Sequence, residues 1–578
     1  MTGPVMQVLP YGDHAFLIQA ADVAGAHRLA DLIDRRAVDL PPDAIDEVVV
    51  GYAVVVVIIG PDPDRADPET CAAWLEGILN KIDRIDPQEN PGTRSPATHH
   101  LPVVFDGDDL DEVAGLIGAS RVRVVELLVG AELEVAFVGF APGFPYLTGL
   151  PLELAGLHRR HTPRTTVPAG SVAVAGGFAS IYPRSTPGGW HLLGRTTEIL
   201  FDPDVPPYSR VSPGDHVRFY AVDAPTIRLP AGSAAATAVA TERAAITDPA
   251  RVALDPGDGP ALMILDPGLL SIVEDGGRRG VARLGVPAAG AADRRALTLV
   301  NLLLGNERGA AAIECTASGP TLRVIGDGHV AVVGAAQGAV DVRVDGLEVA
   351  DATVVPVADG QVVSIGRIRH GLRAYVGIAG GLLTPEHFGS RSSDVLSGLG
   401  AGPLRAGDRL DRGRPGRIRG HLTLPSAPPP RTPVTLHVLP GPRVTPGTGS
   451  EAGLEILASA VWDVAHHVDR IGVRLSAEDG TTISHAPAGS STPMITGAVQ
   501  VPPDGVPIIL LPDHATVGGY PVVACVITAD IPLLGQLTPG DQVAFVVVDQ
   551  AEAAHERRRS WGRDRAVVSG WFPTSAGT

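Results

Sequence analysis

Three acidic residues occupy positions from which they could take part in chemistry. Asp293 follows a Gly-Ala-Ala turn, Glu314 lies in an apolar strand pattern, and Asp513 follows the run Ile-Ile-Leu-Leu-Pro. Clustered carboxylates can hold Mg²⁺ together with nucleotide phosphates, or act as general bases. We therefore predict catalytic roles for Asp293, Glu314 and Asp513. The alternative for Asp293 is a helix cap, because it precedes the helical pattern 295–304.

Arginine is the residue type best suited to binding an anionic substrate in this sequence. A guanidinium group can clamp a carboxylate or a phosphate through two parallel hydrogen bonds. Four arginines stand in turns or at strand ends, and the alternative for each is a surface ion pair. The predicted substrate- or phosphate-binding residues of this type are Arg164, Arg195, Arg278 and Arg391.

Two Gly-rich segments could present backbone N–H groups to a carboxylate or phosphate. The first is 139–149, which contains Gly143, and the second is the turn Gly518-Gly519-Tyr520. The alternative is a barrel rim whose turns need special backbone angles. We predict binding roles for Gly143, Gly518, Gly519 and Tyr520.

The charge composition excludes several functions. The formal net charge of −18 over 578 residues argues against a nucleic-acid partner, which requires a basic face. The single lysine, Lys81, excludes a phosphate-binding Walker A loop, a Schiff-base enzyme, a biotin carrier and a Ser-Ser-Lys amidase. The basic tail 555–565 is interpreted as a solvated terminal segment.

The sequence predicts a cytoplasmic protein without a bound metal. The cysteines Cys71, Cys315 and Cys525 lie far apart, which fits buried thiols in a reducing compartment. The histidine pairs at 99–100 and 466–467 lack a carboxylate or cysteine at ligand spacing. No apolar run of about 18 residues and no secretion signal is seen, so no membrane contact is expected.

The order of apolar patterns predicts a chain of several domains, mainly β with an α+β domain at the start. The stretch 48–59, interrupted by Gly51, indicates two adjoining strands. Three later blocks each close on a Gly-Asp turn before a final strand, at 212–219, 406–410 and 538–545, which predicts three homologous β-barrels. The predicted parts are an α+β domain at 1–95, a barrel at 99–221, a linker at 222–260, barrels at 261–412 and 434–550, and a tail at 551–578.

Longer motifs carry a family resemblance. The segment 138–152 (VGFAPGFPYLTGLPL), with 162–183 and 186–196, resembles the B subunits of bacterial 5-oxoprolinase, also called allophanate hydrolase subunit 1 or kinase-inhibitor type. The segment 269–294 and the motifs at 301–315, 373–383, 389–395 and 497–522 resemble the C subunits, also called allophanate hydrolase subunit 2. The resemblance implies a ferredoxin-like N-terminal domain followed by tandem cyclophilin-like β-barrels.

The resemblance also implies a function. The expected activity is the ATP-dependent opening of 5-oxo-L-proline to L-glutamate, with ATP and Mg²⁺ as cofactors and a separate A subunit as partner. The alternatives are the carboxyltransferase component of a urea-carboxylase system and a sensor-kinase inhibitor. Homo-oligomer formation stays open. Departures from the family pattern at Ala292, Val473 and His514 leave room for a different substrate.

Overall fold

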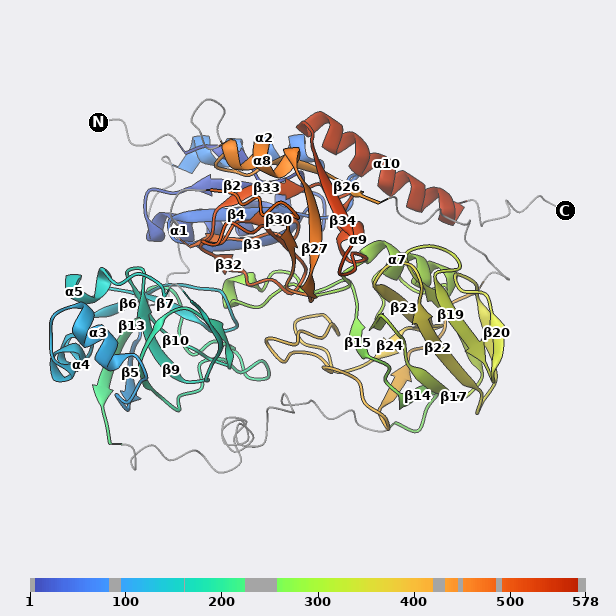
Figure 1. Ribbon diagram of the computed structural model, residues 1–578, viewed down its shortest axis with the longest axis horizontal. Helices are drawn as coiled ribbons and strands as arrows, with labels where there is room; N and C mark the ends of the chain where they lie inside the picture. Colours follow the sequence, from blue (N-terminus) through green and yellow to red (C-terminus); the bar gives the residue numbers. More distant parts are fainter. Residues whose placement is uncertain are drawn as a thin grey trace.

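The computed structural model describes residues 6–82, 95–160, 162–223, 257–418, 432–444, 451–484 and 491–569. They form four packed parts, mostly of β-structure, as predicted. The N-terminal part and the last barrel make up the upper body in Figure 1, with the first barrel at lower left and the middle part at lower right. No helix of the described residues is both long and apolar enough to cross a membrane.

The N-terminal part is an antiparallel sheet of order β1-β2-β4-β3 with two helices, which confirms the predicted α+β domain. Asp22 caps its first helix by accepting a hydrogen bond of 2.6 Å from the Gly25 N–H. The elements are β1 (Val8–Pro10), β2 (Ala15–Gln19), α1 (Val23–Arg36), η1 (Ala37–Asp39), β3 (Ile45–Gly51), β4 (Val54–Ile59) and α2 (Pro68–Ile82).

Both faces of this sheet are buried, which explains the long apolar run. In β4, Val55 and Val57 point into a core with α1 and the first barrel, whereas Val54 and Val56 point into a second core. That second core includes Met494 and other residues of the last barrel, which lie far from β4 in the sequence. A strand covered on both sides needs apolar residues at every position.

The first barrel is a seven-stranded sheet of order β12-β9-β10-β7-β6-β13-β5. Two hydrogen bonds of 2.9 Å between Val104 and Arg195 join its two edges, so the barrel nearly closes. The elements are β5 (Thr98–Val103), α3 (Leu110–Leu116), α4 (Arg121–Val129), β6 (Leu133–Val138), β7 (Pro145–Thr148), α5 (Leu152–Ala155), β8 (Arg164–Val167), β9 (Ser171–Ala175), β10 (Phe178–Ile181), β11 (Thr186–Gly188), β12 (His191–Arg195) and β13 (His216–Ala221).

In the middle part, for which we predicted a barrel over 261–412, a seven-stranded and a five-stranded sheet enclose one core. Helix α7 packs on β18 and β23. The elements are β14 (Ala261–Asp266), β15 (Leu270–Glu274), η4 (Ala282–Leu284), α7 (Arg294–Leu303), β16 (Ala312–Thr316), β17 (Thr321–Ile325), β18 (Gly328–Val333), β19 (Val340–Val344), β20 (Leu347–Val349), β21 (Val355–Val357), β22 (Val362–Ile368), β23 (Arg373–Ile378), β24 (Leu382–Leu383) and β25 (Arg409–Arg412).

The last part is a closed barrel of order β26-β33-β30-β31-β28-β27-β34. Its first and last strands pair in parallel, as β5 and β13 do in the first barrel. The elements are β26 (Val434–Pro440), α8 (Ala452–Ser459), β27 (Val461–Val468), β28 (Gly472–Ser476), β29 (Thr492–Pro493), β30 (Ala498–Gln500), β31 (Ile508–Leu510), β32 (Val517–Gly518), β33 (Val522–Val526), α9 (Ile531–Leu534), β34 (Gln542–Val547) and α10 (Gln550–Ser569).

The three Gly-Asp turns have the same local structure. The side chains of Asp215, Asp408 and Asp541 each accept a hydrogen bond from the backbone N–H three residues earlier, at 3.0, 2.8 and 2.7 Å. Each turn leads directly into the last strand of its part, β13, β25 or β34. This bond from the side chain back to the start of the turn fixes where the final strand begins.

The interpretation of the basic tail as a solvated segment needs a correction at Arg557, whereas its neighbours Arg558 and Arg559 are exposed. Helix α10 lies along the upper body in Figure 1, and Arg557 on it is buried. Its guanidinium donates to the carbonyl oxygens of Asp13, at 3.1 Å, and Gly60, at 2.6 Å. A buried guanidinium needs such acceptors, and the N-terminal part supplies them. Residues 570–578 of the predicted tail and 224–256 of the predicted linker lie outside the described residues.

Candidate functional site

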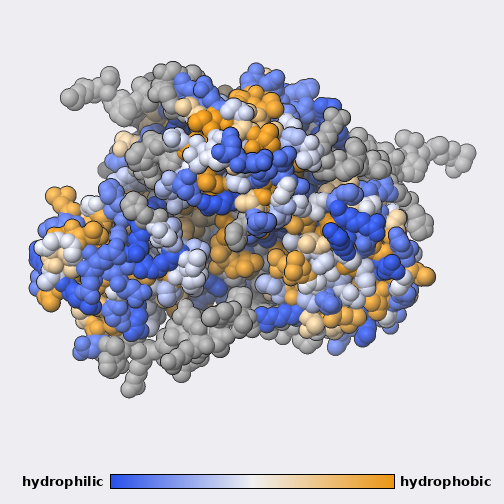
Figure 2. All heavy atoms as spheres, in the orientation of Figure 1, coloured by the Kyte–Doolittle hydropathy of each residue, from blue (hydrophilic) through white to orange (hydrophobic). Residues whose placement is uncertain are grey.

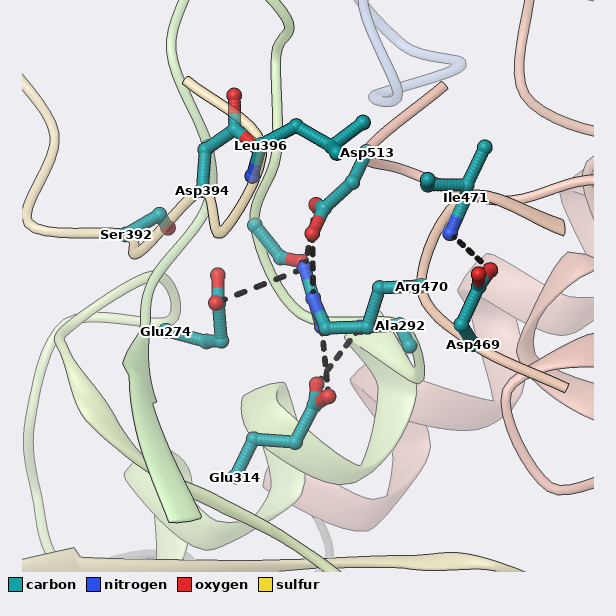
Figure 3. A network of polar contacts seen from close by, with 12 residues as sticks. Glu274, Ala292, Glu314, Ser392, Asp394, Leu396, Asp469, Arg470, Ile471 and Asp513 are labelled. Carbon is teal, nitrogen blue, oxygen red and sulfur yellow. Dashed lines mark hydrogen bonds and ion pairs between the residues drawn. The ribbon is translucent and has the colours of Figure 1, made fainter. Parts of the chain in front are cut away.

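One buried arginine, Arg470, joins the last barrel to the middle part. It lies in the turn between β27 and β28, and Figure 3 shows it surrounded by carboxylates. It donates two hydrogen bonds of 2.8 Å to Asp513, one of 2.6 Å to Glu314 and one of 2.6 Å to the carbonyl oxygen of Gly290. Two residues predicted as catalytic, Glu314 and Asp513, therefore meet at one guanidinium.

A second set of contacts fixes Glu314 in place. Its Oε2 accepts a hydrogen bond of 2.6 Å from the Tyr375 hydroxyl and one of 2.9 Å from the Ala292 N–H. Arg373 forms an ion pair with it at 3.2 Å. Burial raises the pKa of the Glu314 carboxyl, but the nearby Arg470 and Arg373 outweigh burial and hold the pKa below its usual value. Glu314 is therefore a charged anchor.

Glu274 is the third carboxyl of the cluster, and its burial favours the protonated form. It is fully buried, 3.5 Å from Arg470, and neither of its oxygens accepts a well-formed hydrogen bond within the described part of the chain. Burial raises its pKa well above the usual value, against the pull of Arg470. Burial also raises the pKa of Asp513, to about 7. Glu274, Glu314 and Asp513 thus all lie within 3.5 Å of the Arg470 guanidinium.

A cavity of about 240 Å³ lies next to this cluster, where the N-terminal sheet, the middle part, the last barrel and α10 meet. Figure 2 shows apolar residues gathered near the centre of the face in view, where the parts come together. The cavity wall combines apolar side chains with a surplus of positive charge. Its ionisable lining residues are His14, Asp46, Glu47, Arg278, Arg294, Arg295, His514 and Arg557.

Arg294 is the lining residue best placed to bind an anion. It is the first residue of α7, directly after the N-cap Asp293. Burial lowers the pKa of its guanidinium, which Asp46 partly offsets. No hydrogen bond or ion pair joins its side chain to another residue in the described ranges, and Asp46 itself pairs with Arg279 at 2.9 Å. A half-buried cation facing a cavity gains most from a bound anion.

Arg278 is the one predicted arginine that lines the cavity. Its Nη2 donates to the carbonyl oxygen of Ser392. Its Nε and Nη1 are buried and have no partner among the residues that the structure describes. Those two N–H groups are donors left over for a ligand.

Asp293 has the contacts of a helix cap. Its Oδ1 accepts a hydrogen bond of 2.9 Å from the Ala296 N–H, and its Oδ2 accepts one of 2.8 Å from Gln536. Arg391 is likewise engaged, with an ion pair to Glu386 at 3.0 Å and a hydrogen bond to the Thr384 carbonyl oxygen. Both residues hold loops next to the cluster. The catalytic role predicted for Asp293 and the binding role predicted for Arg391 stay predictions.

Arg164 and Arg195 lie on the first barrel, and neither lines the cavity. Arg164 donates to Asp109 at 2.6 Å, and Arg195 pairs with Asp106 at 2.9 Å on the surface. The structure therefore gives both the ion-pair role that the sequence left as their alternative.

Both Gly-rich segments pack against other parts of the molecule. The Gly143 N–H donates to the Leu284 carbonyl oxygen at 2.8 Å, and the Phe140 N–H donates to the Thr516 hydroxyl at 3.1 Å. A Cβ on Gly519 would stand 2.7 Å from a guanidinium nitrogen of Arg159, so the Gly518-Gly519-Tyr520 turn packs against the first barrel. The N–H groups of Phe140 and Gly143 are therefore not free for an anion, and the binding roles predicted for Gly518, Gly519 and Tyr520 stay predictions.

Sequence reasoning missed Arg294 and Arg470 as site residues. Arg470 lies next to Asp469 in the turn, but two of its partners, Glu314 and Gly290, are 156 and 180 residues away in the sequence. No group of three or more metal-binding side chains gathers anywhere in the described residues.

One cavity residue predicts a pH effect on stability. Burial raises the pKa of Glu47 to about 7, although backbone N–H groups of 280–282 lower it. An acid whose pKa rises on folding stabilises the fold at low pH, and this contribution is lost between about pH 4.5 and 7. We expect Glu47→Gln to raise the free energy of unfolding by about 1–3 kcal/mol at pH 8 and to change it little at pH 4.5.

Urea unfolding at the two pH values measures this effect. Glu132→Gln is the control, because Glu132 is exposed and paired with Arg218 on the surface. Equal changes for Glu47→Gln at both pH values would show that folding does not shift the pKa of Glu47.

Comparison with known proteins agrees with this architecture. Residues 6–211 match the family model of carboxyltransferase domain subdomains C and D, and residues 284–547 match that of subdomains A and B. The crystal structure of TTHA0988 superposes with a TM-score of 0.76 at 31% identity, covering 92% of this chain and 99% of that one.

Curated relatives divide the chain in the same way. The chain is 32% identical over 306 residues to the C subunit of 5-oxoprolinase from Escherichia coli K12, covering 51% of this chain and 94% of the relative. It is 39% identical over 191 residues to the B subunit of 5-oxoprolinase from Escherichia coli O157:H7, covering 32% of this chain and 81% of the relative. Urea amidolyase of Lachancea kluyveri is 29% identical over 331 residues, which cover 53% of this chain and 18% of that protein. The chain therefore belongs to the 5-oxoprolinase family of carboxyltransferase-domain proteins, with the counterparts of the B and C subunits in one polypeptide.

Proposed function

We propose that the chain is the fused B and C part of an ATP-dependent 5-oxoprolinase, which opens 5-oxo-L-proline to L-glutamate together with a separate A subunit. The observation that carries the proposal is that one chain covers 94% of a C subunit and 81% of a B subunit. A cytoplasmic location is part of the proposal, and the three free, buried cysteines support it.

The geometry of the cavity supports this substrate. 5-Oxoproline has one carboxylate on a small neutral ring, and the cavity offers one unpaired guanidinium, Arg294, among apolar side chains. Arg278 adds two buried N–H donors without partners among the described residues. We propose that Arg294 binds the substrate carboxylate and that Arg278 donates to an oxygen of the substrate.

The described carboxylates do not fit a Mg²⁺ ion. Glu314 and Asp513 both pair with Arg470, and burial favours the protonated form of Glu274. A magnesium ion needs charged oxygens that no guanidinium already occupies. We propose that ATP and Mg²⁺ enter the reaction with the A subunit, and that this chain contributes the lactam-binding cavity.

Reconstitution tests the proposed function. The purified chain alone is expected to release no glutamate from 5-oxoproline, because it offers no activated Ser, Cys or Lys nucleophile. Addition of a separately produced A subunit with Mg²⁺ and ATP is expected to give glutamate and ADP in equal amounts, measured by chromatography and a coupled ADP assay. Glutamate release by the chain alone would contradict the proposed division of labour.

A carboxyltransferase activity is the second candidate, because both matching family models carry that description. It would require a biotin carrier on another chain, since this chain has a single lysine, Lys81. In the same reconstitution, carboxyl transfer to urea from a carboxybiotinylated carrier, without glutamate formation from 5-oxoproline, would favour this candidate.

A further inference from the structure

The hairpin turn between β1 and β2 carries an aspartate–histidine pair into the cavity. Gly12 opens the turn with a φ of +67°, which favours glycine, and its Cα packs near Cys525 of the last barrel. The Nδ1 of His14 lies 3.3 Å from an oxygen of Asp13. Asp13 is buried, whereas His14 lines the cavity.

Asp13 is built to stay charged. Burial raises its pKa, but His14, Arg557 and Thr528 together outweigh burial and hold the pKa below its usual value. Its oxygens accept hydrogen bonds of 2.9 and 2.8 Å from the N–H and hydroxyl of Thr528. Thr528 belongs to the last barrel region. The hydrogen bonds to Asp13 therefore form only when the two ends of the chain pack together.

The tautomer of His14 follows from its neighbour. A carboxylate can only accept, so the Nδ1 of His14 carries the proton and its Nε2 keeps a lone pair. The Nε2 has no hydrogen-bond partner among the residues that the structure describes. A buried carboxylate that orients an imidazole towards a cavity is the arrangement of a general base.

A second imidazole lines the same cavity. The Nδ1 of His514 lies 2.8 Å from the Ala515 carbonyl oxygen, which can only accept, so its Nε2 also keeps the lone pair when the ring is neutral. Burial lowers the pKa of His514, which favours the neutral ring. The other charged groups facing His14 are Asp46 on β3 and Arg557 on α10, so the surroundings hold charges of both signs.

We propose that His14, oriented by Asp13, is the base that moves the proton of the substrate's lactam nitrogen. This inference rests on the proposed function. The N–H proton passes to the Nε2 of His14 as the lactam oxygen bonds to the phosphoryl group of a nucleoside triphosphate, whose terminal P–O bond breaks to release the diphosphate. When water later adds to the carbon, the C–N bond breaks to leave an acyl phosphate, and the imidazolium returns the proton to the nitrogen. A second water then hydrolyses the acyl phosphate to the carboxylate and inorganic phosphate.

Turnover by the full chain with the A subunit tests the role of His14. His14→Gln is expected to lower kcat at least 100-fold with KM changed less than threefold, and to remove the fall of kcat at acidic pH. Asp13→Asn is expected to lower kcat about tenfold. The matched control is His437→Gln, because His437 forms an aspartate–histidine pair with Asp530 at 2.8 Å outside the cavity. A His14→Gln enzyme within threefold of wild type, with its pH profile intact, would overturn the proposal.

A readout without turnover separates this inference from the proposed function. Diethyl pyrocarbonate acylates neutral imidazoles, and peptide mass spectrometry reports each histidine. We expect 5-oxoproline to protect His14 in the wild-type chain and to leave acylation of His437 unchanged. Turnover by the wild type without protection of His14 would refute the role of His14 alone, whereas absence of turnover by the wild type would refute the proposed function.

Discussion

Replacement of Arg470 by methionine is expected to lower the free energy of unfolding by about 3–5 kcal/mol. The guanidinium is buried and bonds Glu314, Asp513 and the Gly290 carbonyl oxygen. Its removal leaves buried carboxylates without a counter-ion, and the penalty is the cost of their desolvation. The loss should fall on the contact between the last barrel and the middle part, because Arg470 bonds both.

Urea unfolding followed by circular dichroism measures this loss. Arg474→Met is the matched control, since Arg474 lies four residues further along the chain and forms an exposed ion pair with Asp504. Exposed pairs contribute about 0–1 kcal/mol, so the control should unfold almost like wild type. If both variants lost the same small amount of unfolding free energy, water would have to reach the carboxylates around Arg470.

Replacement of Arg294 by glutamine is expected to lower kcat/KM for 5-oxoproline about 30- to 1,000-fold, or about 2–4 kcal/mol, without lowering the melting temperature. The reason is that the guanidinium has no partner among the described residues that its loss could leave unpaired. Its proposed partner is the carboxylate of the substrate, in a cavity lined mainly by apolar side chains.

The neutral carboxamide of 5-oxoproline makes this test specific. Wild type should turn the carboxamide over as poorly as the Arg294→Gln enzyme does, and the variant should barely distinguish the two substrates. Arg323→Gln, an exposed change on β17, serves as the control. Strong preference for the carboxylate substrate in the Arg294→Gln enzyme would assign carboxylate binding to another residue.

The sequence predicts local features of this protein well. The Gly-Asp turns, the strand pair around Gly51 and the helix that begins after Asp293 each depend on residues within a few positions of one another. Asp293 shows the limit of such reasoning, because the same residue fits a cap and a catalytic acid, and only its bond to Gln536 shows that both its oxygens are engaged.

The candidate site was harder to predict because contacts between distant segments build it. Arg164 is a reasonable anion binder by its residue type. In the structure its Nη2 donates to Asp109, more than fifty residues earlier, which the sequence does not show. Asp13 and His14 lie in an ordinary hairpin turn, and their interest depends on Thr528 and on a cavity between the N-terminal, middle and last parts. Arg557 on the basic tail is buried for the same reason, since its acceptors are carbonyl oxygens at the other end of the chain.

The double burial of the N-terminal sheet also has a consequence during synthesis. Val54 and Val56 emerge from the ribosome early, whereas Met494 and Ile495, which cover them, follow roughly 20–90 s later at 5–20 residues per second. During that interval an apolar sheet face is open to water and to other nascent chains. The uncovered face can bind a chaperone or aggregate with other nascent chains until the last barrel is made.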